Sequence, residues 1–568
     1  MTAASDLIRA ALIDAARSLG APEPIDPQLE RPRDPAHGEW ATNMALLLAR
    51  PLRRKPREIA ESLVANLDLQ RVGVARTDVA GPGFINFHLE PGVLAGGLPS
   101  ILSAGERFGR AANGGGRLAN VEFVSANPTG PLHVGHGRQA ALGDAIASLL
   151  EWTGWSVSRE FYYNDAGAQI VNLGASVLAR VRAMAGEEAA IPEGGYHGEY
   201  VSELAARFVA EHGGKGDAAT AASRLIAGAG SPASDGSGSL MDRITRFAVH
   251  ALRAEQDLDM QAFGVEFDRY FLESSLYTEG RVAATVDALR DAGQTYEHEG
   301  ALWLRTTSFG DDKDRVMRKS DGTFTYFVPD VAYHVTKWNR GFHRAVNVQG
   351  ADHHSTVTRV RAGLQALGMG IPEGYPDYVL HQMVTVVSAG EEVRISKRAG
   401  SYVTVRDLID EVGRDAVRYF FLMRKGESQL QFDLDLARSQ SEENPVYYIQ
   451  MAHARMSGIF RVGEIDPVSV TGTDTDLAVL REPEEQALIK ALLDFPAVIA
   501  GAADALEPHR AAGYLLETAR LIHTWYHKHH VLDEPEPITR ARLVLARAAQ
   551  IVLRNGLALL GISAPERM

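Results

Sequence analysis

Two histidines stand three residues apart where the sequence passes from a strand pattern to a helix pattern. His133 and His136 lie either side of Gly135, after an apolar stretch at 120–125 and a turn-forming run at 127–131. Residues three apart share one face of a helix, so both imidazoles would point the same way. The free N–H groups at a helix start attract phosphate, and Gly135 leaves its backbone open to a flat base. The pattern predicts a nucleotide site, although an isolated pair of this kind is also compatible with two surface histidines.

A second segment, about 260 residues further along, combines hydroxyl and basic side chains with a closing glycine. Ser396 and Lys397 lie in the run Val-Arg-Ile-Ser-Lys-Arg-Ala-Gly at 393–400. This run predicts a short strand that enters a basic loop. A mobile loop with a lysine can close over a triphosphate and neutralise the charge that builds up on departing pyrophosphate. Taken alone, the segment is also compatible with a solvated basic turn.

Together the two segments resemble the paired ATP-binding motifs of class I aminoacyl-tRNA synthetases, written H-I-G-H and K-M-S-K-S. The second motif is imperfect, because Arg394, Ile395 and Arg398 stand where the family has lysine, methionine and serine. Since the lysine at 397 does match, it is expected to matter more than Arg394. The resemblance implies that ATP is bound by His133, Gly135, His136, Ser396 and Lys397, with catalytic roles for His133, His136 and Lys397.

The resemblance narrows to the arginyl-tRNA synthetases and extends over nearly the whole chain. Further matching stretches lie at 38–43, 81–87, 121–130, 163–167, 267–274, 350–354 and 443–448. Each stretch alone is weak evidence, but their number and order make coincidence very improbable. The resemblance implies a ligase that joins L-arginine to the 3′ end of tRNA(Arg), with ATP as a substrate together with Mg²⁺.

A pocket for arginine must satisfy a planar, permanently charged guanidinium, which suits carboxylates bidentately. By the resemblance, Asp330 and Glu273 would bind the guanidinium and Tyr326 would line it. Glu122 and Asn127 would hold the α-amino and carboxylate ends of the substrate. The three residues assigned to the guanidinium also have structural interpretations. Tyr326 and Asp330 could form a local hydrogen-bonded pair, and Glu273 could be an exposed acid at the end of a strand.

A polar loop follows the apolar strand predicted at 345–348. Gly350 and Asp352 are expected in the ATP site, with the carboxylate of Asp352 accepting from a ribose hydroxyl, as acids do in open α/β sheets. The adjacent pair His353 and His354 could suggest a metal. However, neighbouring side chains of an extended segment point to opposite faces. No residue is therefore assigned to a metal, and no structural zinc is expected.

Composition limits the class of protein. The chain has 568 residues, 45% hydrophobic content, no cysteine and a net charge of −14, which excludes disulfides and thiolate zinc sites. The N-terminus lacks the apolar core of a signal peptide, and no segment approaches the roughly 18 uncharged apolar residues of a membrane span. A cytoplasmic monomer without membrane contact is expected. A stripe of basic and aromatic residues at 520–530 is a candidate tRNA surface, or else a solvated helical face with core aromatics.

The order of strand and helix patterns predicts an α/β multidomain chain. Its parts are a small α/β N-terminal domain that contacts tRNA (1–112), a Rossmann-like parallel-sheet catalytic domain (117–400) with a helical insertion at about 175–300, a connecting helical segment (401–439) and an all-α anticodon-binding bundle (440–568). Within the catalytic domain, strands are expected at 121–125 and 156–163 around a helix at 132–152. The sheet is then expected to resume near 346 and at 384–387. Residues 213–239, rich in Gly, Ala and Ser, predict a mobile surface excursion.

The predicted reaction has two steps. The carboxylate of arginine attacks the α-phosphate of Mg-ATP, and a terminal ribose hydroxyl of tRNA then takes the arginyl group; alignment and charge stabilisation supply the catalysis. The resemblance also implies that arginine activation depends on bound tRNA. Three alternatives remain: a synthetase for another amino acid such as cysteine, a tRNA-binding paralogue without chemistry, and a small-molecule nucleotidyltransferase.

The assignment of Lys397 to the phosphates can be tested by substitution. Lys397→Ala should slow adenylate formation far more than it weakens arginine binding, because the lysine acts on charge that develops in the transition state. Pre-steady-state adenylate formation and equilibrium arginine binding would measure the two effects. A loss confined to arginine affinity would refute this role.

Overall fold

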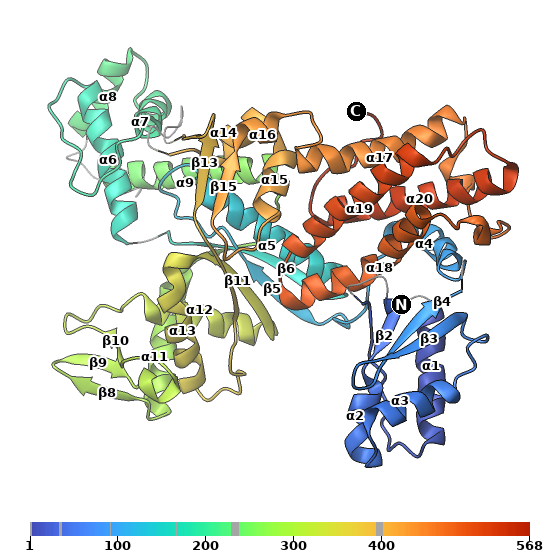
Figure 1. Ribbon diagram of the computed structural model, residues 1–568. Helices are drawn as coiled ribbons and strands as arrows, with labels where there is room; N and C mark the ends of the chain where they lie inside the picture. The colour runs from blue at the N-terminus through green and yellow to red at the C-terminus, as the bar shows by residue number, and fades with distance from the viewer. Residues whose placement is uncertain (1–2, 33–36, 91, 166, 229–237, 394–401) are drawn as a thin grey trace.

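A five-stranded parallel sheet forms the centre of the molecule (Figure 1). The computed structural model describes residues 3–32, 37–90, 92–165, 167–228, 238–393 and 402–568. The central strands are β5 (Leu118–Glu122), β6 (Ser156–Tyr163), β7 (Arg269–Leu272), β11 (Arg344–Gly350) and β12 (Asp377–His381). Their order is β12-β11-β5-β6-β7, so the chain runs from β5 outward to β7 and then crosses to the other side of β5 for β11 and β12. In open parallel sheets ligands bind at the carboxyl ends of the strands where the order reverses, which here is between β5 and β11.

Helix α5 (Val134–Trp152) crosses this sheet and packs on β5, β6 and β11. It is buried along most of its length because it is rich in small residues. At Gly143 an added Cβ would lie 2.1 Å from the ring of Phe123, which is closer than two carbon atoms can approach. The glycine therefore allows the helix to lie directly against the end of β5, and so fixes where the helix begins.

The N-terminal part has a separate core and a four-stranded antiparallel sheet. Its strands, in the order β1-β2-β4-β3, are β1 (Leu29–Glu30), β2 (Trp40–Thr42), β4 (Phe84–Leu89) and β3 (Val74–Ala80), and its helices are α1 (Ala3–Ser18), α2 (Met44–Leu52) and α3 (Pro56–Ala65). Helix α4 (Leu98–Ala104) leads on to the central sheet. Arg31 stacks on Trp40 and donates to Asp494 at 2.8 Å, which joins this part to the C-terminal helices.

A helical insertion separates β6 from β7. It consists of α6 (Ala168–Met184), α7 (Glu199–His212), α8 (Ala218–Ala227) and α9 (Leu240–Ala262), which share a core of their own. Two sequence-based expectations were wrong here. Residues 218–227 form a helix with two buried alanines rather than a mobile excursion. The central sheet also resumes at β7, whose four residues are too few to show a strand pattern.

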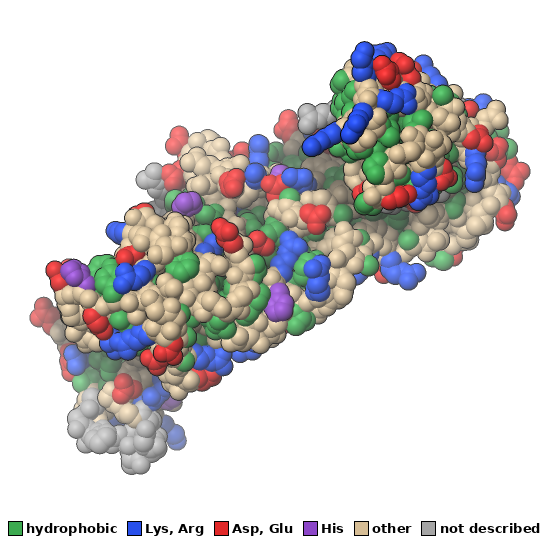
Figure 2. Space-filling view, turned by 90° about the horizontal axis from the view of Figure 1, so that it is seen from below, with side chains coloured by type: hydrophobic (Ala, Val, Ile, Leu, Met, Phe, Trp, Pro, Cys, Tyr) green, Lys and Arg blue, Asp and Glu red, His purple; other side chains and the backbone are tan. Residues whose placement is uncertain are grey.

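A second lobe follows β7, and its helices and small sheet share one hydrophobic core (Figure 1). It contains α10 (Glu273–Thr278), α11 (Arg281–Asp291), α12 (Phe327–Asn339) and α13 (His354–Ala366), with a three-stranded antiparallel sheet of β10 (Arg315–Arg318), β9 (Ala301–Leu304) and β8 (Thr295–His298). Over the face of the molecule in Figure 2, acidic and basic side chains are interspersed.

Beyond β12 the chain forms a further three-stranded sheet. It comprises β14 (Glu391–Glu392), β13 (Val384–Ser388) and β15 (Leu430–Asp433), with helices α14 (Val405–Val412), α15 (Arg414–Leu422) and α16 (Leu434–Arg438). The expectation that 384–387 continues the central sheet was therefore wrong, because β13 pairs with β15 and the central sheet ends at β12. Local sequence shows that a segment is a strand but not which strand it pairs with.

The C-terminal part is a bundle of four helices, α17 (Pro445–Val462), α18 (Pro483–Ala505), α19 (His509–Lys528) and α20 (Glu536–Leu559). Helix α18 is long and apolar enough to cross a membrane by length and composition, although it carries Lys490 and Asp494. Leu488, Ile489 and Leu492 are fully buried in the main core, and this packing explains its apolar character. With the central sheet and the N-terminal part, this bundle confirms the predicted fold class.

The predicted stripe at 520–530 is not a single surface. Trp525 is fully buried, and His523 is buried and contacts the carbonyl of Tyr448. Arg520 and Lys528 pair with the carboxylates of Glu517 and Glu484. Because of the helical periodicity of α19, part of the stripe faces the interior of the bundle. The sequence alone did not show which residues of the stripe are buried.

The close packing of α5 can be tested with a pair of glycine substitutions. Gly143→Ala should lower the free energy of unfolding by about 1–3 kcal/mol, because overpacking outweighs the roughly 1 kcal/mol that alanine gains in a helix. Gly513→Ala in α19, where an added Cβ meets nothing within 4 Å, is the matched control and should stabilise the chain. Urea unfolding measures both; equal changes at the two sites would contradict the packing argument.

Candidate functional site

A cavity of about 970 Å³ opens at the carboxyl ends of β5 and β11, where the strand order reverses. Ten sequence-predicted site residues line it together: Glu122, Asn127, His133, Gly135, His136, Glu273, Tyr326, Asp330, Gly350 and Asp352. They come from separate strands, helices and loops of the chain. Ser396 and Lys397 lie outside the described residues.

The two histidines cap the start of α5 reciprocally. The backbone N–H of His136 donates to Nδ1 of His133 at 3.2 Å, and the backbone N–H of His133 donates to Nδ1 of His136 at 3.3 Å. Their rings stack with centroids 3.6 Å apart. Gly135 permits this arrangement, because a Cβ there would lie 2.8 Å from the His133 ring.

This capping determines what the imidazoles can donate. Since Nδ1 of each ring accepts a hydrogen bond, the proton of each neutral ring lies on Nε2. Burial lowers the pKa of both His133 and His136, so both are neutral at pH 7. Each therefore offers an Nε2–H donor at the positive end of the helix dipole, which suits phosphate oxygens.

The chain reaches α5 through a strained turn. Val124 and Ser125 have φ of 66° and 43°, a left-handed conformation that is unfavourable for a β-branched residue. The turn directs the Ser125 hydroxyl back to Glu122 at 3.1 Å, and this hydroxyl accepts from the backbone N–H of Tyr162. Strain of this kind is typically found at functional sites.

Three carboxyl groups gather at the other end of the cavity. Glu273 accepts a hydrogen bond from the Tyr162 hydroxyl at 3.0 Å, and burial raises its pKa. Burial, together with the neighbouring carboxylates Glu122 and Glu273, raises the pKa of Asp330 to about 8. Among the residues that the structure describes, none donates a hydrogen bond to the Asp330 side chain, and no cation lowers its pKa. The group is arranged for a cation that enters the cavity.

Glu122 differs from the other two acids, because a buried lysine neutralises it. Nζ of Lys337 lies 2.6 Å from the Glu122 carboxylate and 3.0 Å from the amide oxygen of Asn347. The Asn347 amide donates to Nε2 of His334 at 2.7 Å, and Nδ1–H of His334 donates to the backbone carbonyl of Asp330. A continuous series of hydrogen bonds therefore connects the Glu122 carboxylate to the backbone of Asp330.

The cavity also contains residues that sequence reasoning did not select. Tyr162, Tyr333, Asn347 and Gln349 belong to this group, and the buried Oε1 of Gln349 has no partner in the described part of the chain. Lys337 lies behind them, bound to Glu122 and Asn347. One signal could have found Tyr162: it lies near the carboxyl end of β6, which runs parallel to β5 with Glu160 opposite Glu122, so it must lie close to Glu122.

The residues that follow the segment 394–401 lie at this site. Tyr402 lines the cavity, and its ring meets His133 edge-on at 5.9 Å. The backbone N–H of Val134 donates to the carbonyl of Val403 at 3.1 Å. Residues 402 and 403 are therefore held beside the start of α5.

Gly350 ends β11, and Asp352 follows it at the cavity. Asp352 is largely exposed, and its carboxylate lies 3.7 Å from the His353 ring. Within the described ranges, no group of three or more metal-ligating acids and histidines occurs. The exposed carboxylate is available to a hydroxyl in the cavity.

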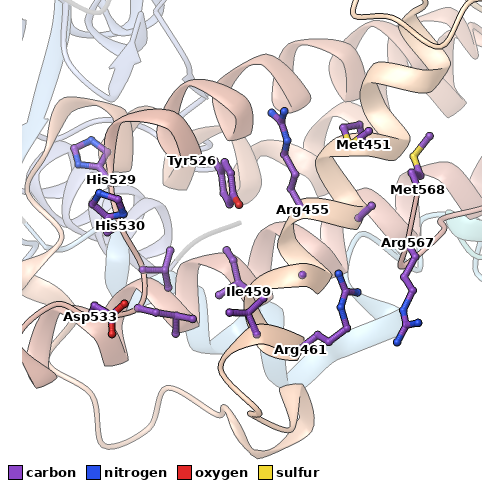
Figure 3. A pocket seen from close by; sticks show the side chains of 15 residues that line it. Met451, Arg455, Ile459, Arg461, Tyr526, His529, His530, Asp533, Arg567 and Met568 are labelled. Atoms are coloured by element: carbon purple, nitrogen blue, oxygen red, sulfur yellow. The ribbon is translucent and has the colours of Figure 1, made fainter.

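A second cavity, of about 870 Å³, lies in the helical bundle (Figure 3). It is enclosed by α17, by the connection from α19 to α20 and by the last residues of the chain. Arg455, Arg461, Tyr526 and Arg567 extend into it from these elements (Figure 3). An aromatic ring beside several cations suits an unpaired base and its phosphates.

These features define a class I aminoacyl-tRNA synthetase. Three family models match the chain: the arginyl tRNA synthetase N terminal domain over residues 3–89, the class I (R) tRNA synthetase catalytic domain over 97–439, and the DALR anticodon binding domain over 449–568. The chain belongs to the arginyl-tRNA synthetase family.

Curated relatives and solved structures agree with this assignment. Proteins named arginine–tRNA ligase from Thiobacillus denitrificans and Geotalea daltonii are 53% and 54% identical, with 98% and 95% of this chain and 98% and 94% of theirs covered. A crystal structure described as an arginyl tRNA synthetase from Campylobacter jejuni has 30% identity and a TM-score of 0.75, over 84% of this chain and all of that one. The Thermus thermophilus arginyl-tRNA synthetase shares the fold at 23% identity, with a TM-score of 0.72 over 99% of this chain and all of that one.

The raised pKa of Asp330 makes the stability of the ligand-free protein depend on pH. The folded state binds this proton more tightly than the unfolded chain does, so Asp330 costs stability increasingly as the pH rises from about 4 to about 8. Asp330→Asn should therefore be the more stable protein at pH 8.5, by roughly 1–3 kcal/mol, with little difference near pH 4. Unfolding measured from pH 4 to 9 tests this, and parallel pH profiles would refute it.

Proposed function

We infer that this chain is an arginine–tRNA ligase: it activates L-arginine with ATP and transfers it to the 3′ end of tRNA(Arg). The observation that carries this function is the acidic recess around Asp330, which opens into the same cavity as the phosphate-binding start of α5. One end of the cavity suits a guanidinium and the other suits a triphosphate. Curated relatives over nearly the whole chain bear the same name.

In the proposed arginine site, the guanidinium lies between Asp330 and Glu273, with Tyr326 over it. Tyr326 supports this role because it lines the cavity and is 78% exposed, ready to cover a ligand. The charge of the incoming cation returns Asp330 to its ionised form. Glu122 and Asn127 bind the α-amino and carboxylate ends, with Lys337 holding Glu122 in place.

In the proposed ATP site, the two Nε2–H donors of His133 and His136 bind the phosphates as neutral groups. Gly135 lies against the base, while Gly350 and the exposed Asp352 meet the ribose. Ser396 and Lys397 complete the triphosphate site; their proposed role is supported by Tyr402, a few residues further along, which meets the His133 ring. Mg²⁺ arrives with ATP as part of the substrate.

The reaction needs no covalent catalyst, because the carboxylate of arginine is already a nucleophile at pH 7. It attacks the α-phosphorus, the bond to the bridging oxygen of the β-phosphate breaks, and pyrophosphate leaves with its charge neutralised by Lys397. A ribose hydroxyl at the tRNA 3′ end then attacks the activated carbonyl, its proton is released, and AMP departs. The chain contributes alignment and fixed dipoles.

The remaining parts are proposed to bind tRNA. The bundle at 440–568 reads the anticodon, and its cavity lined by Arg455 and Tyr526 suits one unpaired base. The N-terminal domain at 1–112 contacts the body of the tRNA. Between these two parts of the proposed domain organisation lie the catalytic domain (117–400) and the connecting segment (401–439). We further propose that the protein acts as a monomer in the cytoplasm.

Pyrophosphate exchange with each amino acid, with and without tRNA, tests the proposed function. We expect exchange with arginine only, and only when tRNA is present. Exchange with cysteine would indicate another synthetase, and exchange without any tRNA requirement would favour a small-molecule nucleotidyltransferase. No exchange with intact tRNA would indicate a paralogue without chemistry.

The Asp330→Asn variant tests the proposed guanidinium pocket in the same pyrophosphate-exchange assay. It should raise the arginine KM by the equivalent of about 2–5 kcal/mol, the cost of separating a buried charge pair, while the KM for ATP changes little. An unchanged KM for arginine would place the guanidinium pocket elsewhere.

A further inference from the structure

The turn that leads into α5 is held in place by side chains from other parts of the chain. Residues 127–131 include Pro128 and Pro131, which have no N–H group, so the turn can form few hydrogen bonds of its own. Inside it, the N–H of Thr129 donates to the carbonyl of Asn127 at 2.8 Å. The other carbonyls of the turn therefore depend on donors from elsewhere.

One residue of the helical insertion binds this turn at both ends. The amide nitrogen of Gln256 in α9 donates to the carbonyl of Asn127 at 3.1 Å and to that of Gly130 at 2.9 Å. Both partners can only accept, so the NH₂ group must face the turn, and this fixes the orientation of the amide. Gln256 is 1% exposed, and its Oε1 is buried without a partner in the described part of the chain. An apolar residue would fill this space without that cost, so packing alone does not explain a glutamine here.

Two tyrosine hydroxyls bind the same turn. Tyr200, in α7 of the insertion, donates to the carbonyl of Thr129 at 2.8 Å, and Tyr402 donates to that of Pro131 at 3.1 Å. A Cβ added at Gly130 would lie 3.3 Å from each hydroxyl, so both hydroxyls converge on this one residue. The turn is therefore fixed between the insertion and the residues that precede α14.

The insertion can hold the turn because its own last helix is anchored. Near the end of α9, Asp259 pairs with Arg406 of α14 at 2.9 Å, so the insertion is attached beyond the turn as well (Figure 1). The N–H of Val405, at the start of α14, donates to the carbonyl of Leu132, just before α5, at 2.9 Å. Gln256 lies about one helical turn before Asp259, so its position relative to the start of α5 is fixed.

The turn carries groups that the proposed reaction must align. Asn127 begins the turn and lines the catalytic cavity, and His133 follows two residues after its end and lines the same cavity. In the proposed function Asn127 holds the carboxylate of arginine, and His133 holds the phosphates of ATP. Attack on phosphorus needs the reacting atoms to be aligned and about 3–3.5 Å apart. The path of the turn therefore sets how the carboxylate meets the α-phosphate.

We propose that Gln256 is a positioning residue for adenylate formation: by holding the turn at Asn127 and Gly130, it aligns the carboxylate of arginine with the α-phosphate of ATP. This inference rests on the proposed function. Gln256 lies behind the turn and acts through it, while the acids around Asp330 bind the guanidinium independently. Loss of the Gln256 amide should therefore slow the reaction without weakening the binding of either substrate.

Gln256→Met tests the proposal, because methionine has a similar volume but no hydrogen-bond donor. The rate constant of adenylate formation per active site, measured in a single turnover with tRNA present, should fall about 10- to 100-fold. The KM values for arginine and ATP should change less than about threefold. A merely structural role would lower the number of active sites found by titration and leave the rate constant per site unchanged.

Gln256→Glu adds a pH-dependent readout at the same position. An ionised carboxylate has no donor for the two carbonyls, whereas the protonated acid can donate to one of them. Burial favours the protonated form. The rate of Gln256→Glu relative to the wild type should therefore rise as the pH falls, while the rate of Gln256→Met relative to the wild type should not. Equal pH profiles for the two variants would contradict the proposed hydrogen bonds.

Asn555→Leu is the matched control, because it removes an equivalent clamp away from the cavity. Asn555 in α20 is also buried, and its amide donates to the carbonyls of Gly105 at 2.9 Å and Phe108 at 3.0 Å. This variant should lose stability but keep the wild-type rate constant per active site. The proposal is overturned if Gln256→Met keeps that rate constant, or if both variants lose it by the same factor.

Hydrogen–deuterium exchange separates this proposal from the proposed function. The N–H groups of Thr129 and Val134, within and just after the turn, should exchange faster in Gln256→Met than in the wild type or in Asn555→Leu. Unchanged exchange at these positions would overturn the proposal even in an enzyme that activates arginine. A wild type that activates no arginine would instead contradict the proposed function.

Discussion

Almost every part of the molecule converges on helix α5, and the position of this helix is the constraint on which the catalytic arrangement depends. Arg138 donates to three backbone carbonyls, those of Gln382, Lys425 and Ser428, which ties the first turns of α5 to the segments beyond β12. Asp144, in the middle of the helix, pairs with Arg159 of β6 and with the fully buried Arg418. These interactions leave the histidine end of α5 little freedom to move.

Arg418 extends the same constraint to the rest of the chain. Its guanidinium donates to the carbonyl of Leu560 at the end of the bundle and to that of Phe263 at the end of the insertion. A buried charge is tolerated only when its donors are satisfied, and here the partners come from three separate parts of the fold. The catalytic helix, the insertion and the bundle therefore share one buried guanidinium.

Sequence reasoning succeeded where a structural signal is short and continuous. The turn and the helix at His133 were predicted from local pattern, although β5 ends at Glu122 and not at Ser125. Asp330, matched by resemblance, lines the same cavity as His133, and its role stays a prediction. Sequence reasoning failed where partners are distant: Lys337 neutralises Glu122 across 215 residues, and no local pattern signals such a pair. β13 was identified as a strand but assigned to the wrong sheet, because pairing is decided by packing and not by propensity. For the stripe at 520–530 the sequence left open a tRNA surface and a helical face with core aromatics. It could not decide between them, because the burial of Trp525 depends on the neighbouring helices.

The acid at the base of the catalytic cavity has a consequence for how the ligase senses its surroundings. With a pKa of about 8, the empty recess holds a proton at neutral pH, and an entering guanidinium must displace it. Arginine uptake would then be an exchange of one cation for another. A fall in pH opposes this exchange, so the empty recess should accept a guanidinium less readily as the pH falls below about 8.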